Sequence, residues 1–248
     1  MLRPAVLAAL VVGLSGSAGG PGAPVMVSAA VSLTEVLETL ARTYEQQTGT
    51  RVILNVGASN VLARQIAAGA GVDLFISAHD VPMDAVSAHL EASTRVDLLL
   101  NQLAIAVPDD RPRRFASARD LTDPHIRRIA VGDPAAVPAG IYAKAYLEKL
   151  GIWTAVSHKL VPSSSVRVAL AAVERGAVDA AIVYTTDLAS ARRARPAYVV
   201  PVSEGPPIRY PAAVVRGGMN TVGGREFLQF LQGAEATQVF RRAGFLRP

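Results

Sequence analysis

The amino-acid sequence predicts an α/β fold of two lobes with a cleft between them. Three observations lead to this prediction. Short apolar segments are typical of buried strands, segments with helical spacing alternate with them, and the alternation occurs twice along the chain. Half of the 248 residues are hydrophobic, which is enough for a packed core and excludes an intrinsically disordered chain.

The first 18 residues have the pattern of a secretory signal peptide. Arg3 precedes an apolar stretch at 5–14, and the small residues up to Ala18 offer a cleavage point. A membrane span is the alternative interpretation, but a span needs about 20 apolar residues, and glycines and prolines interrupt this run. We therefore expect cleavage near residue 18 and export to the periplasm as a soluble protein without stable membrane insertion.

The first half of the chain predicts a β-α-β-α-β series, which implies parallel strands. The strands are expected at residues 25–30, 51–56 and 73–77. The first helix is predicted because apolar residues recur three, four, seven, eight and eleven positions after Leu33. Gly49 ends this helix, and a second helix is expected at 61–68, closed by Gly69.

A single long strand over residues 98–107 is expected next, and a second α/β set follows it. Its strands are predicted at 129–132, 159–162 and 179–184, and its helices at 138–150 and 166–174. The two sets join near 100–108 and again near 200–210. The expected domains are therefore lobe I, residues 25–103 plus 205–248, and lobe II, residues 104–204.

Four strand-to-helix junctions carry residues that suggest a binding site. Ser32 and Ser59 each follow a strand and start a helix, and segments 132–140 and 163–166 lie at equivalent places in the second half. Ligands of open α/β sheets collect at such junctions, where free N–H groups attract anions. Helix capping by serine is the alternative interpretation of each junction. Together, the junctions predict that four helix N-termini form an anion site without a charged side chain.

Residues at these junctions resemble the periplasmic molybdate-binding proteins of ABC transporters. The segments that carry the resemblance are Ala29-Ala-Val-Ser-Leu33, Leu62-Ala-Arg-Gln-Ile66, Asp73-Leu-Phe-Ile-Ser-Ala78, Gly132-Asp-Pro-Ala-Ala-Val-Pro-Ala-Gly-Ile-Tyr-Ala-Lys144 and Ala181-Ile-Val-Tyr184. The resemblance as a whole covers essentially all of the chain after the signal. The resemblance implies a type II periplasmic-binding-protein fold, in which each lobe is a mainly parallel sheet flanked by helices and the ligand cleft lies between them.

The resemblance also implies a ligand and a set of site residues. Molybdate or tungstate would be held by Ser32, Ser59, Ala139, Val166 and Tyr184. The two serines and the tyrosine would donate hydroxyl hydrogens, and Ala139 and Val166 would donate backbone N–H groups. The loop Gly57-Ala-Ser-Asn60 departs from the run of serines in many members, so one auxiliary hydroxyl is missing.

Further expectations follow from the same resemblance. The protein would deliver the oxyanion to an ABC transporter permease and, through it, to the ATPase. It would be a monomer that catalyses no reaction, uses no cofactor and holds molybdenum only within the oxyanion, with no direct metal ligands. Sulfate is the alternative ligand. It has the same charge as molybdate, so only the size of the cavity would allow the protein to distinguish the two anions.

Composition argues against other function classes. The net charge of +5 is compatible with an anionic partner, but aromatic residues are only 5% of the chain, so a nucleic-acid-binding surface is not expected. The chain has no cysteine, which excludes thiol nucleophiles and a lipid-modified N-terminal cysteine. The absence of cysteine also argues against an enzyme with a similar two-lobed fold, such as a hydroxymethylbilane synthase-like transferase, because that enzyme attaches its cofactor through cysteine. A sensing domain of a transcription regulator would have an N-terminal helix-turn-helix, which this sequence lacks.

Other polar residues are given structural interpretations. The four histidines have no metal-binding spacing, and Asp133 is expected to stabilise a turn. Tyr142 and Tyr146 are expected to pack rather than to bind. Two arginine groups are interpreted as solvated loop charge, with anion steering or permease docking as the alternative: Arg111, Arg113 and Arg114, and Arg192, Arg193 and Arg195.

Overall fold

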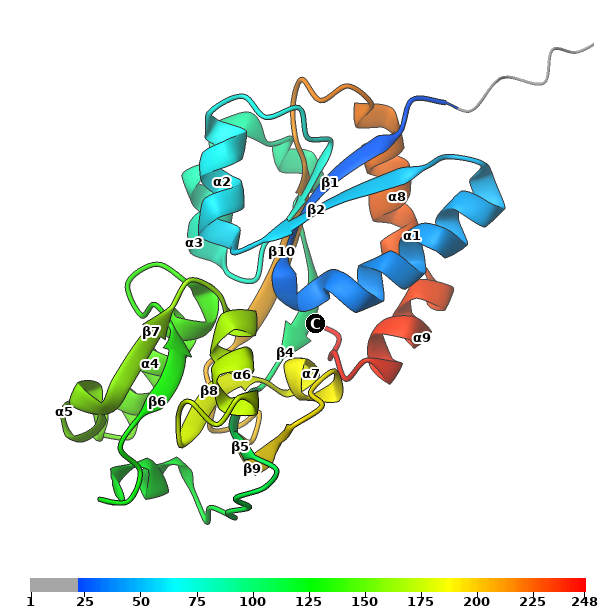
Figure 1. Ribbon diagram of the computed structural model, residues 1–248. Helices are drawn as coiled ribbons and strands as arrows, with labels where there is room; N and C mark the ends of the chain where they lie inside the picture. Colours follow the sequence, from blue (N-terminus) through cyan, green and yellow to red (C-terminus); the bar gives the residue numbers. More distant parts are fainter. Residues whose placement is uncertain (1–21) are drawn as a thin grey trace, which may run out of the picture.

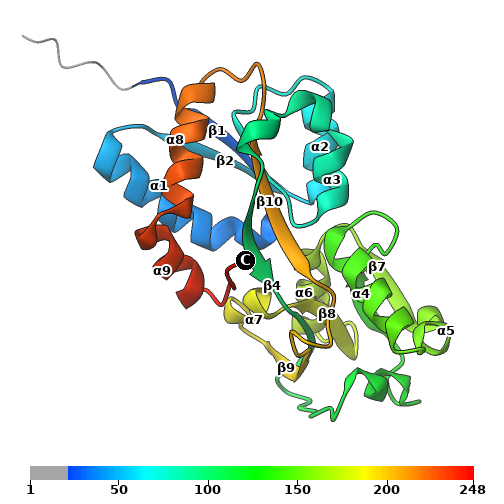
Figure 2. The same ribbon diagram turned by 180° about the vertical axis from the view of Figure 1, so that it is seen from behind.

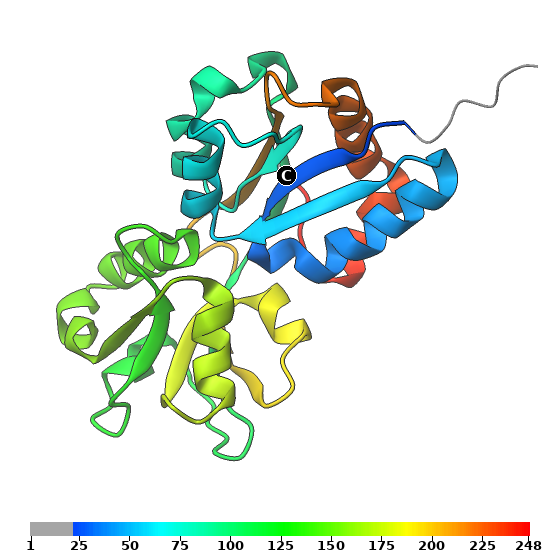
Figure 3. The same cartoon turned by 45° about the horizontal axis from the view of Figure 1, so that its top comes forward.

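The structure is a computed structural model, and it describes residues 22–248. The predicted signal peptide, residues 1–18, lies outside the described residues. The described chain forms two lobes, each built on a five-stranded sheet with helices on both faces (Figure 1; Figure 3). None of the helices within residues 22–248 is long and apolar enough to span a membrane.

The first sheet has the strand order β2-β1-β3-β10-β4. Its strands are β1 (Val25–Ala30), β2 (Val52–Gly57), β3 (Leu74–Ile76), β4 (Val96–Asn101) and β10 (Ile208–Val214). The helices of this lobe are α1 (Thr34–Thr48), α2 (Ser59–Ala67), α3 (Asp80–Ala85), α8 (Thr221–Gln232) and α9 (Ala234–Arg242), with short 3-10 turns η1 (Val31–Leu33), η2 (Ser87–His89) and η3 (Ala92–Thr94). Helices α1 and α8 cover one face of the sheet, and α2 and α3 cover the other (Figure 1; Figure 2).

The second sheet has the order β7-β6-β8-β5-β9. Its strands are β5 (Leu103–Pro108), β6 (Ile129–Gly132), β7 (Leu160–Ser163), β8 (Ala180–Tyr184) and β9 (Ala194–Val199). Its helices are α4 (Pro138–Lys149), α5 (Trp153–Val156), α6 (Val166–Glu174) and α7 (Thr185–Ala189), with 3-10 turns η4 (Ala118–Thr122) and η5 (Ser157–Lys159).

Each sheet is mixed rather than mainly parallel, because one reversed strand lies between two strands of the common direction. In the first sheet, β1 pairs in parallel with β2 and β3, whereas β10 pairs antiparallel with both β3 and β4. Strand β4 therefore runs in the direction of β1, and β10 is the reversed strand. In the second sheet β5 is reversed, because it is antiparallel to β8 and β9.

The prediction of one long strand at 98–107 is wrong. The segment forms two strands, β4 and β5, which belong to different sheets and are separated by Gln102. At this point the backbone N–H of Gln102 donates to Oδ1 of Asn101 at 2.8 Å instead of to a neighbouring strand. Leu98, Leu99, and every residue from Leu103 to Pro108 are buried, so the apolar pattern continues across the change of sheet.

The return connection lies between β9 and β10, within the predicted 200–210 region. Strands β9 and β10 and helices α8 and α9 were not predicted from the sequence. The interpretation of Arg195 as a loop residue is wrong, because Arg195 lies in β9. Arg192 and Arg193 do lie in a loop, and their backbone N–H groups donate to Oε1 of Glu174.

Helix α1 illustrates how the sequence pattern produces the packing. The five predicted apolar positions are its buried residues: Val36, Leu37, Leu40, Ala41 and Tyr44. Gly49 then ends the helix in the left-handed conformation, at φ 71°, which glycine adopts without a Cβ clash. The start of this helix lies one short 3-10 turn after β1, at the carboxyl end of that strand and next to the opposite lobe.

Candidate functional site

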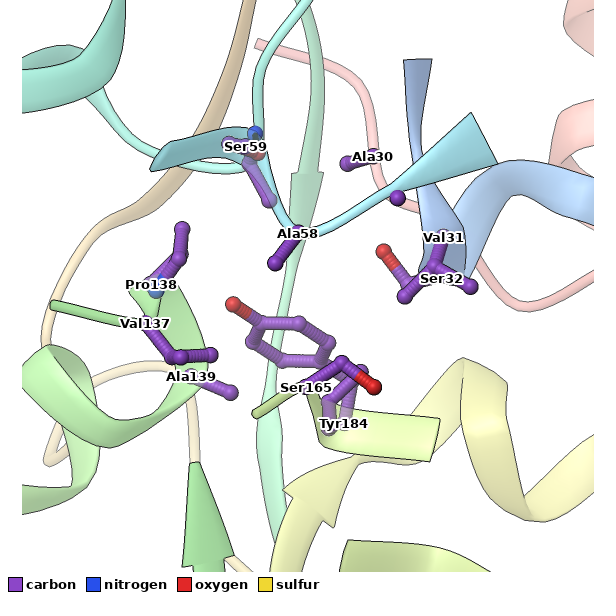
Figure 4. A pocket seen from close by; sticks show the side chains of 13 residues that line it. Ala30, Val31, Ser32, Ala58, Ser59, Val137, Pro138, Ala139, Ser165 and Tyr184 are labelled. Atoms are coloured by element: carbon purple, nitrogen blue, oxygen red, sulfur yellow. Dashed lines mark hydrogen bonds between the residues drawn. The ribbon is translucent and has the colours of Figure 1, made fainter. Parts of the chain in front are cut away.

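A pocket lies between the two lobes, at the carboxyl ends of strands from both sheets (Figure 4). Its cavity volume is about 20 Å³. Pockets for drug-sized ligands are usually larger, roughly 300–1,000 Å³. The size therefore fits a small ion rather than a large organic molecule.

All five residues predicted from the sequence line this pocket: Ser32, Ser59, Ala139, Val166 and Tyr184. The first two come from the first lobe, and the other three come from the second. Each lies where a strand ends: Ser32 in η1 after β1, Ser59 at the start of α2, Ala139 at the second position of α4, Val166 at the start of α6 and Tyr184 at the end of β8.

Glycines bring α4 close to the end of β6. A Cβ on Gly140 would lie only 1.9 Å from the carbonyl oxygen of Gly132, so no larger residue fits there. Pro138 occupies the first helical position, where its missing N–H costs no hydrogen bond. As predicted, Asp133 stabilises the preceding turn, since its Oδ1 accepts from the N–H of Ala135 at 2.9 Å. These features place the first turn of α4 against the pocket.

Three residues that line the pocket at helix starts have backbone N–H groups without an internal acceptor. In the part of the chain that the structure describes, the N–H groups of Ser59, Ala139 and Val166 have no protein acceptor. The first N–H groups of any helix lack an intrahelical partner, and the helix dipole adds partial positive charge at that end. The pocket wall is thus positively polarised without a charged side chain.

The capping interpretation is wrong for Ser32 and Ser59. Neither side chain caps η1, α1 or α2. The Oγ of Ser59 instead accepts from the N–H of Ala78 at 3.0 Å, which leaves the Ser59 hydroxyl hydrogen free to donate elsewhere. A serine does cap α6, but it is Ser165, whose Oγ accepts from the N–H of Val168 at 3.3 Å.

Tyr184 presents a buried hydroxyl with no partner. The residue is only 1% exposed, and its hydroxyl makes no hydrogen bond within residues 22–248. Figure 4 shows the ring lying across the pocket between the two lobes. Burial raises the pKa of Tyr184 well above its ordinary value, so the phenol keeps its proton and remains a donor.

Charged groups stand beside the pocket but are mutually compensated. Arg167 of α6 lies 2.6 Å from Oε2 of Glu35 in α1, which joins the two lobes. Its Nε also lies 3.0 Å from Oδ1 of the fully buried Asp187, close enough for an ion pair although not aligned as a hydrogen bond. Lysine and arginine side chains do not line the pocket. No group of three metal-ligating side chains occurs within the described part of the chain.

Two residues behind Ser32 were missed by the sequence analysis. The hydroxyl of Tyr210 in β10 lies 3.0 Å from Oγ of Ser32, and Asn101 lies next to Tyr210. Tyr210 and Ser32 are 178 residues apart in the sequence, so no local pattern could have predicted this contact. Tyr142 packs as predicted, against His79 of the opposite lobe, and its hydroxyl also accepts from the N–H of Arg209.

Known proteins are similar in sequence to this chain over nearly its whole length. Residues 25–246 match the model of a family described as bacterial extracellular solute-binding protein. The chain is 38% identical over 244 residues to the molybdate-binding protein ModA of Escherichia coli, covering 96% of this chain and 95% of that protein.

Two solved structures support the fold. A periplasmic molybdate-binding protein of Azotobacter vinelandii is 23% identical, with a TM-score of 0.80, and covers 90% of this chain and 99% of that chain. The sulfate-binding protein SubI of Mycobacterium tuberculosis H37Rv is 16% identical, with a TM-score of 0.77 over 90% of this chain and 86% of that chain. At these identities the likeness concerns the fold, and it does not choose between the two ligands.

Proposed function

Because this chain belongs to the bacterial extracellular solute-binding proteins, and within them to the family of the molybdate-binding protein ModA, we propose that it captures molybdate for an ABC transporter. The ligands in this proposal are the hydroxyls of Ser32, Ser59 and Tyr184 and the backbone N–H groups of Ala139 and Val166. Tungstate, which has the same shape and charge, is bound at the same place.

The observation that carries the proposal is the buried Tyr184 hydroxyl without a partner, in a pocket that is also lined by residues with free backbone N–H groups: Ser59, Ala139 and Val166. Leaving a buried polar group unsatisfied costs about 1–3 kcal/mol. A ligand whose oxygens only accept hydrogen bonds removes this cost. Molybdate is such a ligand, since it is fully ionised at neutral pH, whereas hydrogen phosphate carries a proton that needs an acceptor.

We extend the proposal to the rest of the transport cycle, and the similarity to ModA supports this extension. The protein is exported with removal of residues near 1–18, works as a periplasmic monomer, and passes the oxyanion to a permease and its ATPase. Lobe I, residues 25–103 plus 205–248, and lobe II, residues 104–204, close on the ligand. The oxyanion is cargo: no reaction is catalysed, no cofactor takes part, and molybdenum has no direct protein ligand.

Calorimetric titration of the purified exported protein with four anions tests the proposal. Molybdate and tungstate are expected to bind one per chain, and sulfate and phosphate are expected to bind far more weakly or not at all. Sulfate binding that equals or exceeds molybdate binding would transfer the function to the alternative ligand. Absence of binding by all four anions would overturn the anion site.

Serine variants connect the titration to the pocket. Ser59→Ala removes a donor, and a hydrogen bond to a charged group is worth about 1.5–3 kcal/mol, so molybdate affinity should fall roughly 10- to 150-fold. Ser77→Ala is the matched control, because Ser77 is also buried near the end of a strand of the same lobe but does not line the pocket. Its affinity should stay near that of the unmodified protein.

A further inference from the structure

We propose that Asn101 and Tyr210 fix the direction of the Ser32 hydroxyl, so that Ser32 donates its hydrogen into the pocket. They are positioning residues that act through Ser32 and help to reject protonated oxyanions. The inference rests on the proposed function of the pocket as an oxyanion site.

The three side chains form a buried chain of hydrogen bonds. Tyr210 is 0% exposed, Ser32 4% and Asn101 5%. The Nδ2 of Asn101 lies 3.1 Å from the Tyr210 hydroxyl, which in turn lies 3.0 Å from Oγ of Ser32. Water is therefore largely excluded, and the direction of each bond depends on the protein groups alone.

The direction of these hydrogen bonds is determined first by the backbone N–H of Gln102. This N–H can only donate, and it lies 2.8 Å from one side-chain atom of Asn101, which must therefore be the oxygen Oδ1. The hydroxyl of Thr185 donates to the same oxygen at 3.1 Å. The amide nitrogen of Asn101 consequently faces Tyr210 and Thr186, and it donates one hydrogen to each.

The next two steps follow from counting hydrogens. Tyr210 accepts from Asn101 and has one hydrogen, whose remaining partner is Oγ of Ser32. Burial raises the pKa of Tyr210 far above its ordinary value, so this hydrogen is kept. Ser32 therefore accepts from Tyr210, and its own hydrogen is left for the pocket, toward which the hydroxyl points in Figure 4.

A free serine hydroxyl can rotate and either donate or accept. With one lone pair engaged by Tyr210 and no other acceptor for its hydrogen, Ser32 meets a fully ionised oxyanion as a donor. If Ser32 instead accepted the proton of hydrogen phosphate, its own buried hydrogen would be left unpaired. An unpaired buried donor is penalised, which is how sites of fixed polarity discriminate. The Asn101–Tyr210 pair therefore contributes to selectivity without touching the ligand.

The first test replaces Tyr210 by phenylalanine, which keeps the ring and removes the hydroxyl. A typical net hydrogen bond corresponds to a change of roughly two- to tenfold in Kd, so Tyr210→Phe should weaken molybdate binding by about that factor. At the same time, hydrogen phosphate should compete better, so the ratio of the phosphate Kd to the molybdate Kd should fall. Tyr142→Phe is the matched control, because it removes another buried hydroxyl between the lobes that has no contact with Ser32; this ratio should not change.

A double-mutant cycle tests whether Tyr210 acts through Ser32. In a Ser32→Ala background, adding Tyr210→Phe should leave the molybdate affinity unchanged within twofold. If the two changes weaken binding independently, so that their effects multiply, the positioning role is overturned.

Asn101→Asp provides a second variant, should the Tyr210 variant fail to fold. It replaces the donating amide by an acceptor of the same shape, so Tyr210 would donate to the carboxylate and Ser32 would donate to Tyr210. The added negative charge weakens the binding of every anion. The reversed hydrogen-bond direction should in addition weaken the binding of molybdate more than that of hydrogen phosphate. An unchanged ratio of the two Kd values in this variant and in Tyr210→Phe would overturn the inference. Loss of anion binding by the unmodified protein would instead overturn the proposed function, and the inference with it.

Discussion

At the scale of single residues, Tyr184 allows ligand binding and stability to be separated. Its hydroxyl is buried without a partner, so Tyr184→Phe removes an unsatisfied group from the ligand-free protein and a donor from the complex. We expect molybdate affinity to fall roughly 10- to 150-fold, while the melting temperature without ligand stays the same or rises. Calorimetric titration and thermal denaturation of the same preparation measure both quantities.

The opposite result for Tyr184→Phe would be informative. A variant that binds molybdate normally and melts earlier would mean that the hydroxyl serves packing rather than the ligand.

Asp187 gives the protein a pH-dependent stability. Burial raises its pKa to about 7, although the charge of Arg167 and the Tyr184 N–H act to lower it. Between its unfolded value of 3.8 and about 7, the folded state binds a proton that the unfolded state has released. The free energy of unfolding therefore falls as the pH rises through this window, by about 1.4 kcal/mol per pH unit, and the contribution is constant above it.

The variant Asp187→Asn isolates this effect, because the amide does not titrate. Urea denaturation of both proteins from pH 4 to pH 7 should give a difference in unfolding free energy that moves steadily in favour of the variant. Parallel pH profiles would show that Asp187 stays ionised in the folded protein.

At the scale of secondary-structure elements, the contact between α4 and β6 depends on a missing side chain. Gly140→Ala would place a Cβ 1.9 Å from the carbonyl oxygen of Gly132, so the helix start must move. Overpacking typically costs about 1–3 kcal/mol, and molybdate should bind more weakly because the Ala139 N–H moves with the helix. Gly71→Ala is the control, since its Cβ would meet nothing within 4 Å. Equal stability of the two variants would contradict this account.

Most elements of the two sheets follow from local sequence patterns, and the exceptions have physical causes. Helix α6 occupies the predicted residues 166–174, because apolar periodicity and a following glycine are local signals. The division of 98–107 between two sheets was not predicted, since strands β4 and β5 are both apolar and the change of sheet depends on distant partners. Strands β9 and β10 were missed for a related reason: their pairing is with segments far away in the chain.

The site was predictable only in part. Serine at a helix start predicts both a cap and an anion ligand, and the sequence could not separate the two interpretations. For Ser59 the deciding contact is with the N–H of Ala78, which donates to Oγ, and for Ser32 it is with the hydroxyl of Tyr210. These contacts show which partners the two serine hydroxyls have in place of a helix end. Both contacts arise from tertiary packing, so the five pocket positions were predictable whereas the direction of their hydrogen bonds was not.

At the scale of the whole molecule, contacts between the lobes hold the pocket together. Besides the Glu35–Arg167 pair, the N–H of Arg209 donates to the Tyr142 hydroxyl at 3.2 Å. A ligand that touches both lobes should favour this arrangement over an open one. We expect small-angle scattering to record a smaller radius of gyration when molybdate is added and no change with phosphate. The same radius with and without saturating molybdate would contradict closure on the ligand.

The position of β10 also bears on the order in which the molecule folds. All strands of the second sheet lie in one continuous segment, residues 103–199, so this sheet can assemble as soon as that segment exists. The first sheet cannot, because β10 separates β3 from β4 and follows the entire second sheet along the chain. Such long-range pairing slows folding, since the loop must close before the contacts form. The pocket requires both sheets, and it is therefore among the last parts of the chain to acquire its native geometry.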